Sequence, residues 1–354
     1  MDSLTQIVLG AAVGEAVLGK KVGNKALLWG GIAGTIPDLD VVYIWLTGGG
    51  AIDEIVLHRG ISHSITFAVL MAPILGWLIN WLYRKSAEAD FKQWTALFFF
   101  AIFTHPLLDS LTTYGTQLFL PFSDYRVSIA TVFVVDLFYT LPFLLSVIAL
   151  SFVNRTNGWR KRINYFGLAI STAYLLLGLT NKYIASNVFE EDLKAEPEKK
   201  ELVFVGTTPL NVALWYGVAE TDSAFHIGYY SLFDETDDLR WVGFHKNHHL
   251  ISDLENEYGI DRLKWFSDQL FVLTEPHPDT LNFYTLKFGR SKFESETPEG
   301  SFLFYMKVVR NPNGELEYLS IREPDVDKMG DQLNGLYERV MGNRSVFNLS
   351  ESGD

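Results

Sequence analysis

The first half of the chain consists of long apolar stretches separated by short polar connections. The long stretches cover residues 26–46, 65–82, 94–118, 129–153 and 163–185. Each is close to the roughly 20 residues that a helix needs to cross about 30 Å of hydrocarbon. A shorter stretch, Leu4 to Leu18, follows an N-terminal segment without basic residues, so we expect a retained helix rather than a secretory signal peptide. The pattern predicts a bundle of about five or six transmembrane helices, some of them broken at proline.

The second half alternates apolar and polar positions in short runs, which is typical of half-buried strands. Strands are expected in "ELVFVGTT", "AFHIGYYSLF" and "FLFYMKVV", and "NPNG" before "ELEYLSI" predicts a hairpin turn. Residues 326–342 are expected to be helical. The predicted organisation is a transmembrane helical domain at 1–187, a charged linker at 188–200 and a soluble α+β domain at 201–354.

Charge divides the chain at the same place. Residues 1–187 hold 13 Lys and Arg against 11 Asp and Glu, whereas residues 188–354 hold 16 against 31. Ten of the first 13 cations fall in three alternate connections: Lys20, Lys21 and Lys25; Arg84, Lys85 and Lys92; and Arg155, Arg160, Lys161 and Arg162. The positive-inside rule makes these connections cytoplasmic and places the C-terminal domain outside. The absence of cysteine is compatible with an extracytoplasmic domain that uses no disulfides.

Ionisable residues within apolar spans are costly and by default mark functional sites. Those in or beside the apolar stretches are Glu15, Asp38, Asp40, His58, Arg59, His63, His105, Asp109 and Asp136. On the predicted topology, all of them except Glu15 lie toward the outer side of the membrane. Glu15 lies in the cytoplasmic half, and we expect it to be a helix contact. The others predict one polar site at the outer depth.

Two proline-containing motifs supply carboxylates and one imidazole to this depth. In "GTIPDLD", Pro37 breaks a helix in mid-span, and Asp38 and Asp40 on the resulting loop can converge on one cation. In "THPLLDS", Pro106 suits the first turn of a helix, and His105 and Asp109 then share one face at i and i+4. This spacing suits two metal ligands, or one ligand and the carboxylate that orients it.

The third motif, "HRGISHS", adds two imidazoles and a guanidinium. Its Gly60 allows a turn, and Ser62 can cap the helix that carries His63. Imidazole together with carboxylate suits Zn²⁺, Mn²⁺ or Fe²⁺ better than Ca²⁺. Taken alone, each motif has a structural alternative: a helix contact, a loop at the headgroups, or an Arg59 that snorkels as an anchor. Their coincidence at one depth favours a metal site.

In this order, the motifs resemble those of the bacterial YdjM-like inner-membrane metal-dependent hydrolases. The likeness covers about residues 1–150 through "MDSLTQIVLGAAVGEAVLG", "PDLD", "HRGISHS" and "THPLLDSLTTYGT". It implies a multi-span protein of the bacterial inner membrane that is distantly similar to the zinc-dependent phospholipase C and P1 nuclease group. The positions that match the family's motif residues are Asp38, Asp40, His58, His63, His105 and Asp109. The chain departs at Gln6, where many members have histidine, so a ligand is lost here or an amide oxygen replaces it.

These residues predict hydrolysis assisted by one or two divalent metals, most simply Zn²⁺. A bound metal lowers the pKa of water toward ~7 and polarises a phosphoryl or acyl oxygen. Asp40, Asp109 or Asp136 can accept the proton, and Arg59 can pair bidentately with a phosphate. The expected partners are the lipid bilayer and a lipid-linked or phosphorylated substrate, and no nucleic acid is expected.

Two other classes of function stay open at this point. A transporter can also line a cavity with His and Asp, but it usually shows paired halves with corresponding helix breaks. The chain has no second copy of "PDLD" or "HRGISHS". A non-catalytic anchor for the C-terminal domain would need no buried ionisable cluster.

Overall fold

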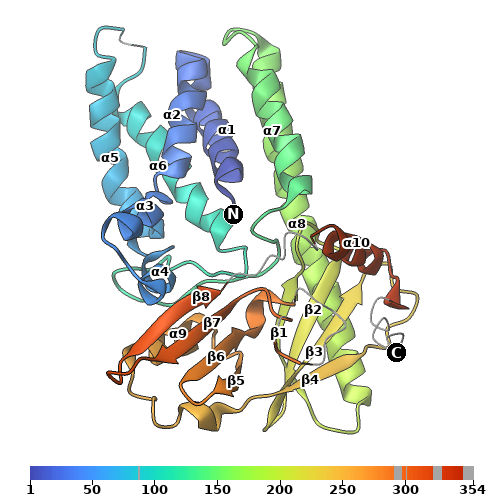
Figure 1. Cartoon of the computed structure of the whole chain (residues 1–354). Helices are drawn as coiled ribbons and strands as arrows, with labels where there is room; N and C mark the ends of the chain where they lie inside the picture. Colours follow the sequence, from blue (N-terminus) through green and yellow to red (C-terminus); the bar gives the residue numbers. More distant parts are fainter. Residues whose placement is uncertain (87, 291–296, 300, 322–328, 346–354) are drawn as a thin grey trace. The chain divides into compact units, whose positions relative to one another are not determined.

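The computed structural model describes residues 1–86, 88–290, 297–299, 301–321 and 329–345. The chain forms two compact units (Figure 1). The first unit contains Met1–Gly48, Leu57–Gly178 and Pro209–Asn211, and the second contains the remaining described residues. The first unit is helical, whereas the second is built on antiparallel sheets.

The helical unit holds fewer candidate spans than the apolar stretches predict. Its helices are α1 (Ser3–Val22), α2 (Asn24–Thr35), α3 (Leu39–Leu46), α5 (Ile65–Leu82), α6 (Phe91–Asp109), α7 (Leu137–Ser151) and the first part of α8 (Gly158–Ala195). Over the described residues, α5 and α8 are long and apolar enough to cross a membrane. The pair α2 and α3, bent by 46° after Thr35, makes a third if it is one span.

Glycines let α1 and α2 pack with their backbones in contact. A Cβ at Gly10 would lie 2.3 Å from the carbonyl oxygen of Gly30, and one at Gly34 would lie 2.5 Å from that of Gln6. Only small residues allow such a close approach between helices, a kind of packing that is common between membrane helices. The contact holds the start of α1 against the end of α2, directly before the break at Pro37.

The apolar residues between α6 and α7 form a folded loop rather than parts of two long helices. The stretches 94–118 and 129–153 were expected to be continuous, but α6 ends at Asp109 and α7 begins at Leu137. Protein groups satisfy much of the loop backbone: Ile65 N–H donates to Leu118 O at 3.0 Å, and Arg126 Nη2 donates to Tyr114 O at 2.6 Å. Non-helical backbone is tolerated within a membrane when protein surrounds it in this way.

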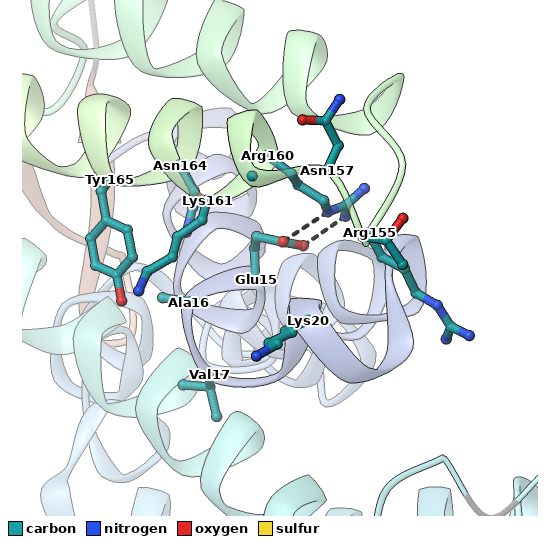
Figure 2. Close-up of a pocket in the computed structure, with 12 residues that line it drawn as sticks. Glu15, Ala16, Val17, Lys20, Arg155, Asn157, Arg160, Lys161, Asn164 and Tyr165 are labelled. Carbon is teal, nitrogen blue, oxygen red and sulfur yellow. Dashed lines mark hydrogen bonds and ion pairs between the residues drawn. The ribbon is translucent and has the colours of Figure 1, made fainter.

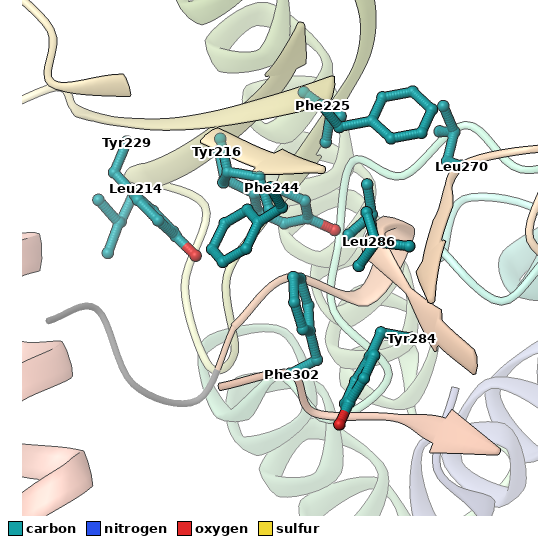
Figure 3. Packing of buried hydrophobic residues seen from close by; sticks show 12 residues of the cluster. Leu214, Tyr216, Phe225, Tyr229, Phe244, Leu270, Tyr284, Leu286 and Phe302 are labelled. Carbon is teal, nitrogen blue, oxygen red and sulfur yellow. The ribbon is translucent and has the colours of Figure 1, made fainter. Parts of the chain in front are cut away.

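The second unit contains two four-stranded antiparallel sheets, each with its strands in sequence order. One sheet comprises β1 (Glu201–Thr207), β2 (Leu214–Glu220), β3 (Ala224–Ser231) and β4 (Trp241–His245). The other comprises β5 (Phe271–His277), β6 (Thr280–Thr285), β7 (Tyr305–Arg310) and β8 (Leu316–Ile321). Aromatic side chains from both sheets, among them Tyr216, Phe244 and Tyr284, form one buried cluster (Figure 3).

The sequence predictions for this half largely agree with the structure. The three expected strands are present, and Arg310 pairs with Leu316 across the "NPNG" turn, which confirms the hairpin. Of the helix expected at 326–342, residues 326–328 lie outside the described residues, and the rest forms α10 (Met329–Val340). The remaining α-helices of the described chain are α9 (Tyr258–Phe266) in this half and α4 (Ala51–Leu57) in the first half. Helix α8 continues to Ala195, through most of the charged stretch at 188–200.

Candidate metal centre

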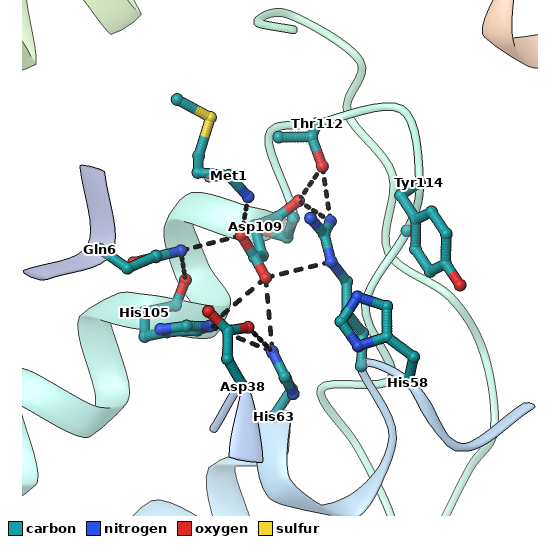
Figure 4. A network of polar contacts seen from close by, with 12 residues as sticks. Met1, Gln6, Asp38, His58, His63, His105, Asp109, Thr112 and Tyr114 are labelled. Atoms are coloured by element: carbon teal, nitrogen blue, oxygen red, sulfur yellow. Dashed lines mark hydrogen bonds and ion pairs between the residues drawn. The ribbon is translucent and has the colours of Figure 1, made fainter. Parts of the chain in front are cut away.

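Four of the predicted ligands meet at one buried point of the helical unit (Figure 4). Asp38 lies in the break between α2 and α3, and His63 ends the 3₁₀ turn Ile61–His63 before α5. His105 and Asp109 lie in the last turns of α6. One ligand atom of each residue lies within 4.8 Å of all the others. Among the described residues, this is the one group of three or more His, Cys, Asp or Glu side chains that could hold a metal ion.

The distances within this group match the requirements of a small divalent cation. The Nε2 atoms of His63 and His105 are 3.1 Å apart. Asp38 Oδ1 is 3.4 Å from each of them, and Asp109 Oδ2 is 3.5 Å from each. Tetrahedral ligands bonded to Zn²⁺ at about 2.0–2.2 Å lie about 3.3–3.6 Å apart. The donor types and five of the six separations between donor atoms therefore fit a zinc-sized ion, and all four atoms lie within 4.8 Å of one another.

Both histidines are oriented through their other ring nitrogen. His105 Nδ1 lies 2.6 Å from the carbonyl oxygen of Gly34, which can only accept a hydrogen bond, so Nδ1 carries the proton and Nε2 presents a lone pair. His63 Nδ1 lies 3.0 Å from Ser62 Oγ and 3.3 Å from Asp40 Oδ2. Histidines that bind metals are held in this way by a carbonyl or a carboxylate.

The electrostatics of the group also favour a cation at its centre. Asp109 Oδ2 is buried and accepts no hydrogen bond within the described chain. The side chains of His63 and His105 are fully buried, and their Nε2 atoms, 3.1 Å apart, leave no room for a water between them. Two unprotonated ring nitrogens and two carboxylate oxygens at these distances repel one another, so the group requires a positive charge at its centre, either a metal ion or a histidine proton.

Arg59 enters the same site with its backbone in an unfavourable conformation. Its φ is +58°, a left-handed value that is uncommon for residues other than glycine and that clusters at functional sites. Its Nε lies 3.2 Å from Asp109 Oδ2, and its Nη1 donates to Thr112 Oγ1 at 2.7 Å. A snorkelling anchor carries its guanidinium to the headgroups, whereas that of Arg59 is buried beside the ligands. These contacts favour a role at the site.

The structure places Asp40 and His58 outside the group of four. Asp40 accepts hydrogen bonds from Arg59 N–H at 2.9 Å and Ser62 Oγ at 3.2 Å, and it lies 3.1 Å from His58 Nδ1. Residues two apart at a helix start point about 200° away from each other, so Asp38 and Asp40 diverge. Asp40 therefore lies behind His63, where it orients the ring, and His58 lies beyond Asp40.

Asp136 is not brought to the cluster. It is the N-cap of α7, where its carboxylate accepts from Phe138 N–H at 3.0 Å and Tyr139 N–H at 3.1 Å. The Tyr174 hydroxyl donates to its other oxygen at 2.8 Å. Within the described chain, all of its hydrogen bonds therefore go to α7 and α8. The apolar run placed Asp136 inside a span because hydropathy does not show where the helix begins.

Two local predictions were also wrong. Pro106 lies in the last turn of α6 instead of the first turn of a new helix, although His105 and Asp109 still share a face. Ser64, not Ser62, caps α5, accepting from Phe67 N–H at 3.0 Å. The Ser62 hydroxyl instead takes part in the site: it donates to Asp40 Oδ2 at 3.2 Å and lies 3.0 Å from His63 Nδ1.

The sequence identified Gln6 only as a departure from the family motif, and it did not predict that the amide nitrogen, rather than the oxygen, contacts Asp109. Gln6 Nε2 donates to Asp109 Oδ1 at 2.8 Å and to His105 O at 3.3 Å, and the Met1 nitrogen also contacts Asp109 Oδ1. Gln6 thus orients a candidate ligand through its amide group. The signal available in the sequence was its position within the N-terminal motif. No local pattern indicated Gly34 or Thr112.

The helical unit and its site define a class: membrane proteins with candidate spans and a buried His/Asp cluster that could hold a metal ion. The family described as YdjM inner membrane protein matches residues 1–185, and the chain belongs to this family. The match includes every residue of the candidate site. The chain is also similar to the uncharacterized protein YfhP of Bacillus subtilis (strain 168), with 26% identity over 236 residues, or 64% of this chain and 68% of YfhP. No solved structure matches the chain.

Proposed function

We propose that the protein is a membrane-embedded, metal-dependent hydrolase that cleaves a phosphoester, most simply one attached to a lipid. One observation carries the proposal: two oriented imidazoles and two carboxylates converge at 3.1–3.5 Å beside a buried guanidinium. Asp38, His63, His105 and Asp109 would hold the metal, with Zn²⁺ favoured over Mn²⁺ or Fe²⁺ by the tetrahedral spacing. When bound, such a metal supplies a Lewis acid and an activated water.

Arg59 would contribute a single donor to the substrate. Asp109 and Thr112 already engage its Nε and Nη1, whereas its Nη2 makes no hydrogen bond within the described chain. Nη2 can therefore donate to a phosphoryl oxygen while the rest of the group stays fixed. This replaces the bidentate contact that the sequence predicted.

The pair of Asp40 and His58 is the best-placed proton acceptor. Asp40 Oδ1 holds His58 Nδ1 at 3.1 Å, and the His58 ring centre lies 5.9 Å from that of His63. A carboxylate that fixes one ring nitrogen leaves the other free to take a proton. Asp109 is assigned as a ligand, and Asp136 caps α7, so neither is available for this role.

Exposure indicates how a substrate would approach. The side chain of the proposed ligand Asp38 is 22% exposed, and that of His58 is 21% exposed. The side chains of the other proposed ligands, His63, His105 and Asp109, are 0–1% exposed. Helix α3, which starts beside Asp38, carries exposed Tyr43, Trp45 and Leu46. Apolar and aromatic side chains at this position suit the membrane interface. A substrate with a lipid tail fits this approach better than a small soluble ester does.

We also propose that α1, α6 and α7 cross the membrane with the candidate spans, which gives a multi-pass protein with its C-terminal unit in the periplasm. The 10-to-3 division of cations between alternate connections supports this orientation. A periplasm-specific reporter fused after residue 190 should be active, and one fused at Arg160 should be inactive. The reverse pattern would place the site toward the cytoplasm and reject the proposed orientation.

The hydrolase proposal is tested by metal content and turnover of the full chain purified in detergent. The wild-type protein should hold a tightly bound transition metal, and His63→Ala and His105→Ala should each weaken binding by at least about 10–100-fold, the loss typical of merely removing an orienting group. His249→Ala, an exposed histidine of the second unit, is the matched control and should keep the metal.

Hydrolysis is then measured against a bacterial lipid extract. Wild type and His249→Ala should release phosphorylated product in a chelator-sensitive way, and both site variants should not. Undiminished metal in the site variants would refute the metal centre. Bound metal without turnover, combined with gradient-dependent uptake in proteoliposomes, would favour a transporter over an enzyme. A protein without bound metal would favour an anchor.

A further inference from the structure

A polar cavity lies at the far end of α1 from the His/Asp cluster. Its volume is about 400 Å³, within the range of small-molecule sites. The last turns of α1, the connection at 155–157 and the first turns of α8 line it (Figure 2). Gln6 and Lys20 are 14 residues apart on α1, so about 21 Å of helix separates the two sites. The cavity is therefore not part of the proposed catalytic centre.

A closed ion pair forms one wall of the cavity. Arg160 donates to Glu15 through Nε at 2.8 Å and through Nη2 at 2.7 Å, and both side chains are buried. Arg160 Nη1 also donates to Asn24 Oδ1 at 2.8 Å and to Val153 O at 2.6 Å. This pair is electrically neutral and holds the connection in place. The remaining charges of the cavity determine what it binds.

Those remaining charges are positive. Lys20 and Lys161 line the cavity and make no ion pair in the part of the chain that the structure describes. The Lys161 ammonium lies 5.4 Å from the centre of the Tyr165 ring, and Arg155 adds a cation that Glu88 pairs at 3.1 Å. The positive end of the α8 dipole also lies here, because the helix begins at Gly158. Together these groups favour an anion.

One buried acceptor in the lining lacks a partner. Asn164 is 2% exposed, and its Nδ2 donates to Ala12 O at 3.0 Å, which fixes the orientation of the amide. Its Oδ1 accepts no hydrogen bond within the described chain. A buried acceptor without a donor costs about 1–3 kcal/mol, so a ligand that brings a hydroxyl donor gains from it.

We propose that this cavity binds the headgroup of an anionic phospholipid that carries a free hydroxyl, as phosphatidylglycerol does. Lys20 and Lys161 hold the phosphodiester, and the hydroxyl donates to Asn164 Oδ1. The proposed topology puts this cavity on the cytoplasmic side, where basic pockets between membrane helices bind such headgroups. Trp159 and Phe166, both exposed on the first turns of α8, offer apolar surface for the acyl chains. A free phosphate ester would not use that surface.

The test measures lipid binding to the full chain in detergent by native mass spectrometry with added phosphatidylglycerol. The variant Lys20→Gln with Lys161→Gln should bind roughly 10- to 30-fold more weakly, the loss expected for two lysines at an anionic headgroup. The matched control, Lys21→Gln with Lys92→Gln, removes two exposed cations that do not line the cavity and should bind like wild type.

Three further probes separate the parts of the proposal. Phosphatidylcholine should bind much more weakly than phosphatidylglycerol. Phosphatidylmethanol, which keeps the charge but lacks the hydroxyl, should bind roughly 3- to 10-fold more weakly, the loss of one hydrogen bond. Glycerol 3-phosphate should not compete at similar concentration. Equal binding by the variant and its control, equal binding of the lipids, or full competition by glycerol 3-phosphate would overturn the proposal.

Discussion

The two units bury charged side chains in different ways. In the sheet unit, Arg339 of α10 donates to both oxygens of Asp234, at 2.6 and 2.8 Å, and to Tyr229 O at 3.0 Å. In the helical unit, Arg59 pairs with Asp109 on one side, but Asp109 Oδ2, Asp38 Oδ1 and two histidine nitrogens also converge on one point. Buried ionic groups that serve structure are paired and hydrogen-bonded. A cluster in which several ligand-type atoms also converge on one point is instead what a metal ion can complete.

The helical unit contains a closed ion pair as well as the converging His/Asp cluster, so the difference between the two arrangements does not depend on whether helices or sheets surround them. Glu15 and Arg160 form a closed pair at one end of α1, as Asp234 and Arg339 do in the sheet unit. At the other end of α1, Gln6 supports the open cluster through Asp109. Both arrangements are buried, so burial alone does not identify the functional site. The convergence of several nitrogen and oxygen atoms on one point distinguishes the candidate metal centre from the ion pair.

Breaking the closed pair of the sheet unit should have the largest effect on stability. Arg339→Ala leaves Asp234, whose side chain is fully buried, without its bidentate partner. Removing one member of a buried pair costs about 3–5 kcal/mol. Arg344 Nη2, 3.3 Å from Asp234 Oδ2, remains, so we expect a loss near the lower end of that range. Hydrogen exchange of β2 and β3 in the full chain in detergent measures it.

An apolar replacement of the whole pair provides the control for this prediction. Arg339→Met combined with Asp234→Leu should lose less stability than Arg339→Ala, because no uncompensated charge stays buried. Exchange in α1 and α6 should not change in either variant. Equal losses in the single and double variants would show that packing, rather than the ion pair, explains the effect.

A smaller effect, on turnover rather than stability, is expected at the open cluster. Arg59→Lys keeps the positive charge, but an ammonium cannot contact Asp109 and Thr112 and also present a third nitrogen to a phosphate. Both residues carry a Cβ, so the strain of the positive φ is the same in each. We expect normal metal content and a loss of ~1–3 kcal/mol in transition-state stabilisation.

The measurement for Arg59→Lys compares kcat/KM for lipid phosphoester hydrolysis with that of wild type. Arg162→Lys, an exposed substitution of the same kind, should be as active as wild type. Full activity in Arg59→Lys would rule out phosphate recognition by the guanidinium. Loss of metal in this variant would instead assign Arg59 to holding Asp109 in place.

Local geometry explains which parts of the fold and site the sequence predicted. A proline in mid-span breaks a helix, so the bend beside Asp38 followed from Pro37. Positions i and i+4 share a helix face, so His105 and Asp109 were expected to act together. The turn of the β7–β8 hairpin followed in the same way from its residues.

The features that were missed depend on contacts between distant residues. Arg59 and Asp109 are 50 residues apart, and nothing in "HRGISHS" indicates that the guanidinium turns inward. Hydropathy is the same for an apolar loop and an apolar helix, so residues 110–118 and 129–136 were assigned to spans. The separation of Asp38 from Asp40 depended on where α3 begins, and boundaries are the least predictable feature of a helix.

The smallest expected effect is a pH dependence of the sheet unit, and it follows from Asp234. Burial opposes the ionisation of this carboxyl, but the hydrogen bonds from Arg339 outweigh it and hold the pKa of Asp234 below its usual value. At pH values near the unfolded pKa of about 3.9, the unfolded chain therefore binds more protons than the folded one. The stabilisation is complete above this pH and is lost as the pH falls through the lower folded pKa.

Asp234→Asn isolates this contribution because it keeps the shape of the side chain and cannot titrate. Hydrogen exchange of β3, extrapolated to the free energy of opening, should fall more steeply for wild type than for the variant between about pH 5 and pH 3. Above pH 5 the two curves should run parallel, with the variant less stable. Parallel curves across the whole range would mean that Asp234 has the same pKa in both states. The closed pair would then not contribute through its charge, and the contrast with the open cluster would rest on hydrogen bonding alone.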